Sequence, residues 1–194
     1  MLLFSFAACK NSKSDENNTT TTEQSTVELD VEQLKYNWTD GVLNFENGKE
    51  ITLPCTVSQI VEVSGFQIQN LDIVSNGGLD PDESKDIYLV GKDICICIEC
   101  ENLTDENVNL MDATVVEYSF NNTRDGNKNI KFANTLTIGV GKADVEKALG
   151  EPKKTASDTL YIYSGRNDKR QKVELRINFN SENLVNSVAF EIEE

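Results

Sequence analysis

Hydrophobic and polar residues alternate along several stretches of this chain, most regularly near its C-terminus. In 172–179, apolar side chains alternate with charged or amide side chains, and 184–191 has a similar pattern. Successive side chains of a β-strand point to opposite faces of a sheet, so this alternation predicts strands with one buried and one solvent-facing side. The predicted strands are 86–90, 93–100, 110–120, 159–163, 172–179 and 184–191.

A short amphipathic helix is predicted ahead of each group of three strands. The segments 53–65 and 138–150 both begin with an aliphatic residue, continue through polar residues and end at a glycine after the last apolar position. Glycine enters the left-handed region of backbone conformation without strain, which makes Gly65 and Gly150 helix C-caps. Pro152 then prevents the second helix from continuing.

These elements occur in the same order in both parts of the chain. An Asp-Gly turn precedes each helix, at 40–41 and at 125–126, and 110–118 matches 184–192 in detail. We therefore expect an α+β fold of two tandem helix-plus-three-strand meander repeats, to which chance similarity of two short amphipathic patterns is the alternative. Joined edge to edge, the meanders would form one antiparallel sheet of about six strands with both helices on one face.

The N-terminal residues have the pattern of a lipoprotein signal peptide. Residues 1–8 are mostly apolar or small and lead to Cys9, and the polar run behind it cannot bury enough apolar surface to fold. We expect lipidation of Cys9, with 9–27 as a disordered linker. This linker would tether the two repeats, 28–122 and 123–194, to the extracytoplasmic face of the cell membrane.

Two features depart from the usual signal peptide. Phe6 stands where an aliphatic residue is usual, and no Lys or Arg precedes the apolar run, which suggests that Met1 is internal or that the start was assigned late. A frayed apolar N-terminus of a cytoplasmic protein is the alternative. Such a short run cannot span a bilayer core of about 30 Å as a helix, so the expected membrane attachment is an anchor.

The composition narrows the possible functions. The formal net charge is −15, and the basic residues form only one local cluster, between Arg166 and Lys172. Long-range repulsion makes nucleic acid and anionic lipid poor partners. The chain has no His, which removes the commonest general base and metal ligand and excludes hydrolases of the Ser/His and Cys/His types. We expect no catalytic residue, no cofactor and no bound metal, and therefore no enzyme activity.

Four cysteines lie within the predicted repeats, three of them in 95–100. Cys97 and Cys100 have the spacing of one half of a zinc knuckle, but the sequence offers no second half. Period-two geometry places Cys95 and Cys97 opposite the isoleucines, which favours a buried central strand that uses Cys as a small apolar residue. A disulfide between Cys55 and one of the other three, and a metal site, are the alternatives.

The second predicted repeat resembles a known family pattern. The run Ile138–Pro152 is followed by a strand that carries Tyr161 and Tyr163 and by two strands that end at Glu191. This succession is similar to the small SmpA/OmlA-type envelope lipoproteins. It also resembles the tandem repeats of β-lactamase-inhibitor-like proteins, which share the unit of a helix and three strands.

The resemblance covers residues 134–194, with a weaker echo in 50–120. Lys142 or Ala143 replaces the usual small hydroxyl residue at the helix start, and one helix instead of two precedes each meander. The resemblance implies an open sheet face that grips another protein, and it transfers no contact residue to this chain. The sequence also resembles the acidic surface lipoproteins of anaerobic gut Firmicutes, many of which have no assigned role.

The candidate binding residues lie in the second repeat. Tyr161 and Tyr163 share one face of their strand, and we expect Arg176 and Glu174 on the same sheet face. Aromatic rings beside an Arg are typical of protein-contact hot spots, whereas tyrosines packed at a sheet edge are the alternative. The acidic loop 80–86 offers oxygen ligands for calcium but lacks the pattern of an EF-hand, which favours a solvated loop.

The expected function follows from these features together. We expect a lipid-anchored, extracytoplasmic, non-enzymatic module that binds another protein through the open face of its sheet. A structural or stress-related envelope lipoprotein is the alternative. An enzyme or a solute-binding component is disfavoured, because the sequence contains no catalytic triad, phosphate loop or metal set.

Overall fold

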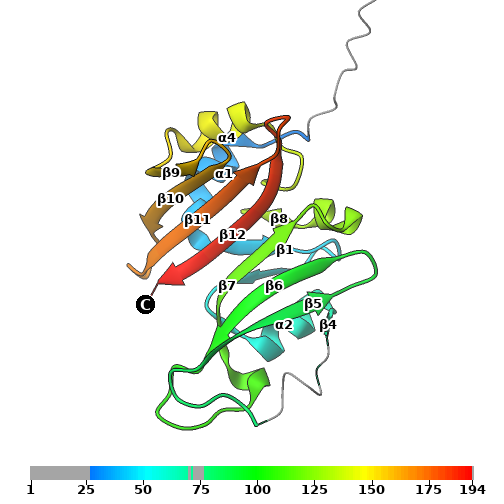
Figure 1. The fold of residues 1–194 in the computed structure, drawn as a ribbon, viewed down its shortest axis with the longest axis vertical. Helices are drawn as coiled ribbons and strands as arrows, with labels where there is room; N and C mark the ends of the chain where they lie inside the picture. The colour runs from blue at the N-terminus through cyan, green and yellow to red at the C-terminus, as the bar shows by residue number, and fades with distance from the viewer. Residues whose placement is uncertain (1–26, 70, 72–76, 194) are drawn as a thin grey trace, which may run out of the picture.

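A long antiparallel sheet forms the body of the protein (Figure 1). The computed structural model describes residues 27–69, 71 and 77–193, and the strand order within them is β4-β5-β6-β7-β12-β11-β10-β9. The α+β class with antiparallel pairing that the sequence predicted is confirmed. The strands are β4 (Gln67–Ile68), β5 (Ser84–Val90), β6 (Cys95–Glu101), β7 (Thr114–Asn121), β9 (Lys154–Ser157), β10 (Leu160–Arg166), β11 (Lys172–Phe179) and β12 (Val185–Glu193).

The two groups of strands meet where β7 pairs with β12. Phe190 of β12 lies directly opposite Tyr118 of β7, and Glu191 lies opposite Glu117. The aromatic pair faces one side of the sheet and is fully buried, whereas the glutamates face the other side. This central pairing makes the strands of both parts of the chain one continuous sheet.

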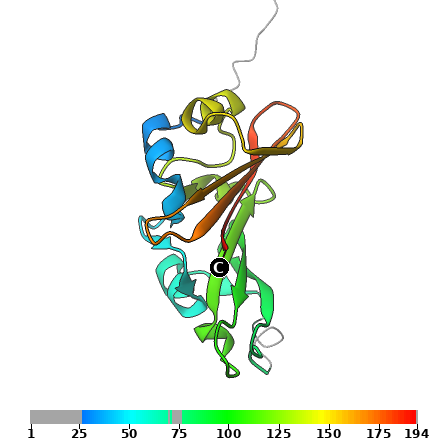
Figure 2. The ribbon, with the colours of Figure 1, turned by 90° about the vertical axis from the view of Figure 1, so that its left-hand side faces the viewer.

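All three helices of the described residues cover the same face of the sheet (Figure 2). Thr56 caps the N-terminus of α2 by accepting a hydrogen bond from the Gln59 N–H, and the Gln59 side chain accepts one from the Thr56 N–H. Gly65 ends α2 in the left-handed conformation, as expected from the sequence, and Gly150 ends α4 with a positive φ. The helices are α1 (Val31–Asn37), α2 (Val57–Ser64) and α4 (Lys142–Leu149).

A small second sheet lies among the helices, with the strand order β2-β1-β8. Its central strand follows Gly41, and its third strand follows the turn at Asp125, so a strand follows each of the two Asp-Gly turns. Another short strand, β3 (Cys55–Thr56), pairs with β7. The remaining elements are β1 (Val42–Asn44), β2 (Glu50–Thr52), β8 (Lys131–Phe132), η1 (Trp38–Asp40), η2 (Leu110–Asp112) and η3 (Asp125–Asn129).

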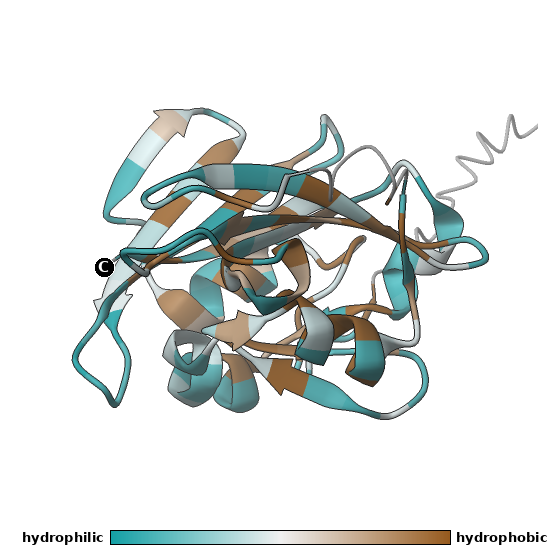
Figure 3. Cartoon of the chain, turned by 90° about the horizontal axis from the view of Figure 1, so that it is seen from below, coloured by the Kyte–Doolittle hydropathy of each residue, from teal (hydrophilic) through white to brown (hydrophobic). Residues whose placement is uncertain are grey.

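One hydrophobic core fills the space between the long sheet and the elements on its covered face (Figure 3). The rings of Tyr118, Phe132 and Phe190 pack together at its centre, with centroids 5.3 to 6.4 Å apart. Helix α1 packs on α4, and β1 pairs with β8, so elements on both sides of the predicted boundary at residue 122 contribute to this core. Among the elements that the structure describes in full, none of the α-helices lies on the opposite face of the sheet (Figure 2).

Candidate functional site

The uncovered face of the sheet carries a row of carboxylates at one cross-strand position. Residues that lie opposite each other in neighbouring strands have side chains within contact distance, so this position forms a line across the sheet. Five consecutive strands of the path contribute one acidic residue each. This acidic row consists of Asp86, Glu99, Glu117, Glu191 and Glu174, on β5, β6, β7, β12 and β11 in that order.

Arg176 lies beside this row and binds three of its members. Its guanidinium forms ion pairs with Glu117 (2.7 Å between Nη2 and Oε2), with Glu174 (3.2 Å between Nε and Oε1) and with Glu191 through Nη2. Like charges directly opposite each other in a sheet repel, so the arginine compensates the three carboxylates at the β11 end of the row. Only one positive charge serves three carboxylates, and the row keeps a negative charge at neutral pH.

Glu117 is the most constrained member of the row. Partial burial raises the pKa of its carboxyl, the charge of Arg176 opposes this shift, and the neighbouring carboxylates Glu191 and Glu99 add to it. A raised pKa means that the surroundings favour the neutral form relative to water. Additional positive charge placed on this face would therefore relieve an unfavourable arrangement.

A second row of side chains crosses the uncovered face two residues along each strand from the acidic row. Tyr88, Cys97, Ser119, Ala189 and Arg176 lie opposite one another on the same five strands. The Tyr88 side chain is 50% exposed at one side, while serine and alanine occupy the middle. Exposed aromatic rings such as that of Tyr88 are enriched at protein-contact surfaces.

The structure separates the four residues that the sequence grouped as a binding patch. Arg176 and Glu174 lie on the uncovered face, but Tyr161 and Tyr163 are buried on the covered face, so the prediction of one shared face is wrong. The Tyr161 hydroxyl donates to Oε1 of Glu146 on α4 at 2.7 Å, and the Tyr163 hydroxyl donates to the Gly150 carbonyl at 3.3 Å.

The reason for this error lies in the register of β10 and β11. Tyr161 is opposite Ile177 and Tyr163 is opposite Leu175, which places both tyrosines among the buried positions of the sheet. Tyrosine is long enough to bury its ring while its hydroxyl reaches a polar partner on the helix. Tyr161 also packs edge-on against Phe179, and Nζ of Lys142 lies 4.4 Å from the centre of its ring.

The cysteines of β6 follow the predicted alternation. Ile96 and Ile98 are buried, whereas Cys95 and Cys97 are half-buried on the uncovered face. Cys55, Cys95, Cys97 and Cys100 are all free thiols. Burial and nearby acidic groups raise the pKa of Cys97 to about 11, so its thiol stays protonated near neutral pH and is a poor nucleophile.

The acidic loop 80–86 is divided between two places. Asp80 and Asp82 are exposed outside the acidic row, where Oδ1 of Asp80 accepts a hydrogen bond from the Asn107 side chain, whereas Asp86 lies on β5 within the row. Cys9, with the predicted signal peptide 1–8, lies outside the described residues. Among the described residues, no helix combines the length and the hydrophobicity that crossing a membrane requires.

Comparisons with known proteins found no relative of this chain. No family model, no curated protein and no solved structure matches it. The site is therefore defined by its own geometry, which is an uncovered sheet face with an acidic row, an arginine that pairs with three of its carboxylates and an exposed tyrosine.

Proposed function

We propose that this protein is a non-enzymatic module that binds another protein through the uncovered face of its long sheet. The observation that carries the proposal is the acidic row. Its five carboxylates lie on the face that α1, α2 and α4 leave uncovered, and Arg176 pairs with only three of them. Charge concentrated on one face steers a partner of opposite charge and orients it.

The partner contributes a positively charged segment to the complex. The ion pairs of Arg176 do not extend to Asp86 and Glu99, which lie on the side of the row next to Tyr88. Lys or Arg side chains of the partner would bind these carboxylates, and their aliphatic stems would pack on the Tyr88 ring. The pairing is electrostatic and surface-exposed, so its strength should fall as salt is added.

The fold supports a second part of the proposal, that the two parts of the chain are tandem repeats. In each part a strand precedes a helix and four antiparallel strands follow it, β4 to β7 in the first part and β9 to β12 in the second, one more than the predicted three. Equivalent strands meet at the middle, since β1 pairs with β8 and β7 pairs with β12. The position of Glu117 in 110–118 corresponds to that of Glu191 in 184–192, and these two residues lie opposite each other. We assign the chain on this basis to the repeat lipoproteins that the sequence resembles.

Lipid anchorage at Cys9 completes the proposed function. Val27, the first described residue, forms a bridge with Val140 near α4, so the chain enters the fold at one end of the elongated sheet (Figure 1). A polar linker of the length of 9–27 would hold the fold near the extracytoplasmic membrane surface without fixing its orientation. The uncovered face would then remain accessible to a partner at the cell envelope.

A capture experiment tests this proposal. A soluble form with Cys9→Ser is immobilised and exposed to the native cell envelope at low and at high salt. The bound proteins are identified by mass spectrometry. We expect a basic partner that is captured by the parent protein, released by salt and lost in the variant Asp86→Asn, Glu99→Gln.

The matched control is Tyr161→Phe, which changes the covered face only. This variant should capture the same partner as the parent protein, because the Tyr161 hydroxyl bonds to α4. Equal capture by the acidic-row variant would contradict binding through this face. Capture of no protein would favour a structural or stress-related role in the envelope.

A further inference from the structure

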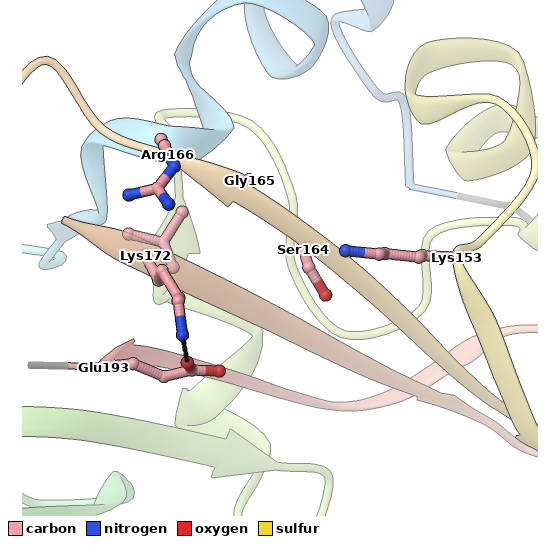
Figure 4. Close-up of a pocket in the computed structure, with 7 residues that line it drawn as sticks. Lys153, Ser164, Gly165, Arg166, Lys172 and Glu193 are labelled. Atoms are coloured by element: carbon pink, nitrogen blue, oxygen red, sulfur yellow. Dashed lines mark hydrogen bonds and ion pairs between the residues drawn. The ribbon is translucent and has the colours of Figure 1, made fainter. Parts of the chain in front are cut away.

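One third of the basic residues of this acidic chain, six of 18, lie at one end of the sheet. Residues 153–172 contain six Lys and Arg against two Asp, whereas the whole chain carries a net charge of −15. The β10–β11 hairpin brings four of these cations to its tip, and Lys153 approaches from the segment before β9 (Figure 4). This segment is therefore positively charged within a negatively charged protein, and the acidic row does not account for it.

Several of these side chains line one hollow of about 500 Å³. Ser164 and Arg166 alternate on β10 and therefore point to the same side, and Lys172 lies opposite Arg166 on β11. Lys153 extends toward Ser164 across the hollow (Figure 4). One guanidinium, two ammonium groups and a hydroxyl thus surround a single space.

Two of these cations already have a partner within the protein. Nη1 of Arg166 donates to the Arg170 carbonyl at 2.7 Å, which ties the guanidinium to the turn of the hairpin. Nζ of Lys172 lies 3.4 Å from Oε2 of Glu193, and the two side chains are 63% and 43% exposed. An exposed pair of this kind contributes little stability, so a ligand with more negative charge can replace Glu193 as the partner of Lys172.

We propose that this hollow binds the phosphate group of a small phosphate ester. A phosphate monoester carries up to two negative charges and several acceptor oxygens, which matches three cations and a hydroxyl better than a single carboxylate does. The hollow is larger than an inorganic phosphate ion, so it also accommodates a small organic group attached to the phosphate. The hollow lies on the same uncovered face as the acidic row, at its β10 end, where Ser164 is opposite Glu174. It is nevertheless a distinct site, because none of the carboxylates of the acidic row lines it.

The phosphate could belong to a soluble ester or to a lipid headgroup. The chemistry of recognition is the same for both, because the cations contact only the phosphate. The net charge of −15 opposes approach to an anionic membrane surface, which favours the soluble ester. The experiment therefore includes an arm for each source.

Isothermal titration of the full chain with glycerol 3-phosphate tests the site. We expect saturable binding that weakens as salt is added. The double variant Arg166→Ala, Lys172→Ala should lower the affinity about tenfold, because two charged contacts are lost. Glu193→Gln should raise the affinity about twofold, because it releases Lys172 from its competing partner.

The controls separate a built site from general attraction to positive charge. Lys131→Ala removes an exposed lysine of β8 and should leave the affinity unchanged. Glycerate, which carries a carboxylate, should bind more weakly than glycerol 3-phosphate. Sedimentation with phosphatidylglycerol vesicles but not with phosphatidylcholine vesicles would assign the phosphate to a lipid. Absence of saturable binding to ester and vesicles, or equal losses in the Lys131 variant and the double variant, would overturn the proposal.

Discussion

Phe190→Ala should lower the free energy of unfolding by about 3–5 kcal/mol, the range for removal of a buried aromatic ring from a core. Phe190 is fully buried, and its ring lies 5.9 Å from that of Tyr118 and 5.3 Å from that of Phe132. Gly41 packs so closely on this ring that a Cβ atom at position 41 would clash with it. The ring thus joins the long sheet to the small sheet, and its loss leaves a cavity between them.

Urea denaturation measures this loss with two probes. Trp38 is the only tryptophan and packs near Gly165 of β10, while far-UV circular dichroism reports on the whole sheet. Both transitions should shift together, since the buried residues form one core. Ser187→Ala, a half-buried position on the uncovered face of the same strand, should change stability by less than about 0.5 kcal/mol. A loss below about 1 kcal/mol, or a shift in one probe only, would contradict a single shared core.

Arg176→Gln should destabilise the protein by about 2 kcal/mol at pH 7. The variant removes the cation that contacts Glu117, Glu174 and Glu191, and three neighbouring carboxylates then repel one another. Removing one partner of a fully buried pair costs about 3–5 kcal/mol. The Arg176 side chain is 32% exposed, so solvent screens part of this effect.

The loss should depend on pH in a defined direction. Burial already raises the pKa of Glu117, and removal of the Arg176 charge, which opposes this shift, raises it further. A carboxyl whose pKa is raised on folding binds more protons in the folded than in the unfolded state. The free energy of unfolding therefore falls as the pH rises from the pKa of the unfolded state through that of the folded state. The deficit of the variant should thus be small near pH 4 and full near pH 7. Arg166→Gln, at the hairpin, serves as the control, and a deficit of equal size at both pH values would contradict the network.

Most of the long sheet could be predicted from the sequence because its strands alternate clearly. The predicted stretch 172–179 coincides with β11, since every second residue is buried against the core. The glycines at 65 and 150 correctly marked the ends of two helices. Helix α1 gave no comparable signal, because Leu34 is its only buried residue, and β9 gave none because all of its residues are exposed.

The acidic row could not be predicted without the pairing of the strands. Alternation identifies residues that share one face of a strand, but it gives neither the register between strands nor the face that the helices cover. The match of 110–118 with 184–192 placed Glu117 and Glu191 at equivalent positions, and only the β7–β12 pairing makes them neighbours. The same missing information explains why Tyr161 was wrongly placed on the face of Arg176. Alternation allowed either face for its side chain, and only its hydrogen bond to Glu146 on α4 shows that it lies on the covered face.

Site-specific photocrosslinking in intact cells tests the central claim most directly, that the uncovered face contacts a protein partner. A photoreactive phenylalanine analogue replaces Tyr88 on this face or Glu62, an exposed residue of α2 on the opposite side. The account predicts a discrete crosslinked product from position 88 that disappears when Asp86 and Glu99 are changed to lysine, and no such product from position 62. No product from position 88, or the same product from both positions, would contradict it.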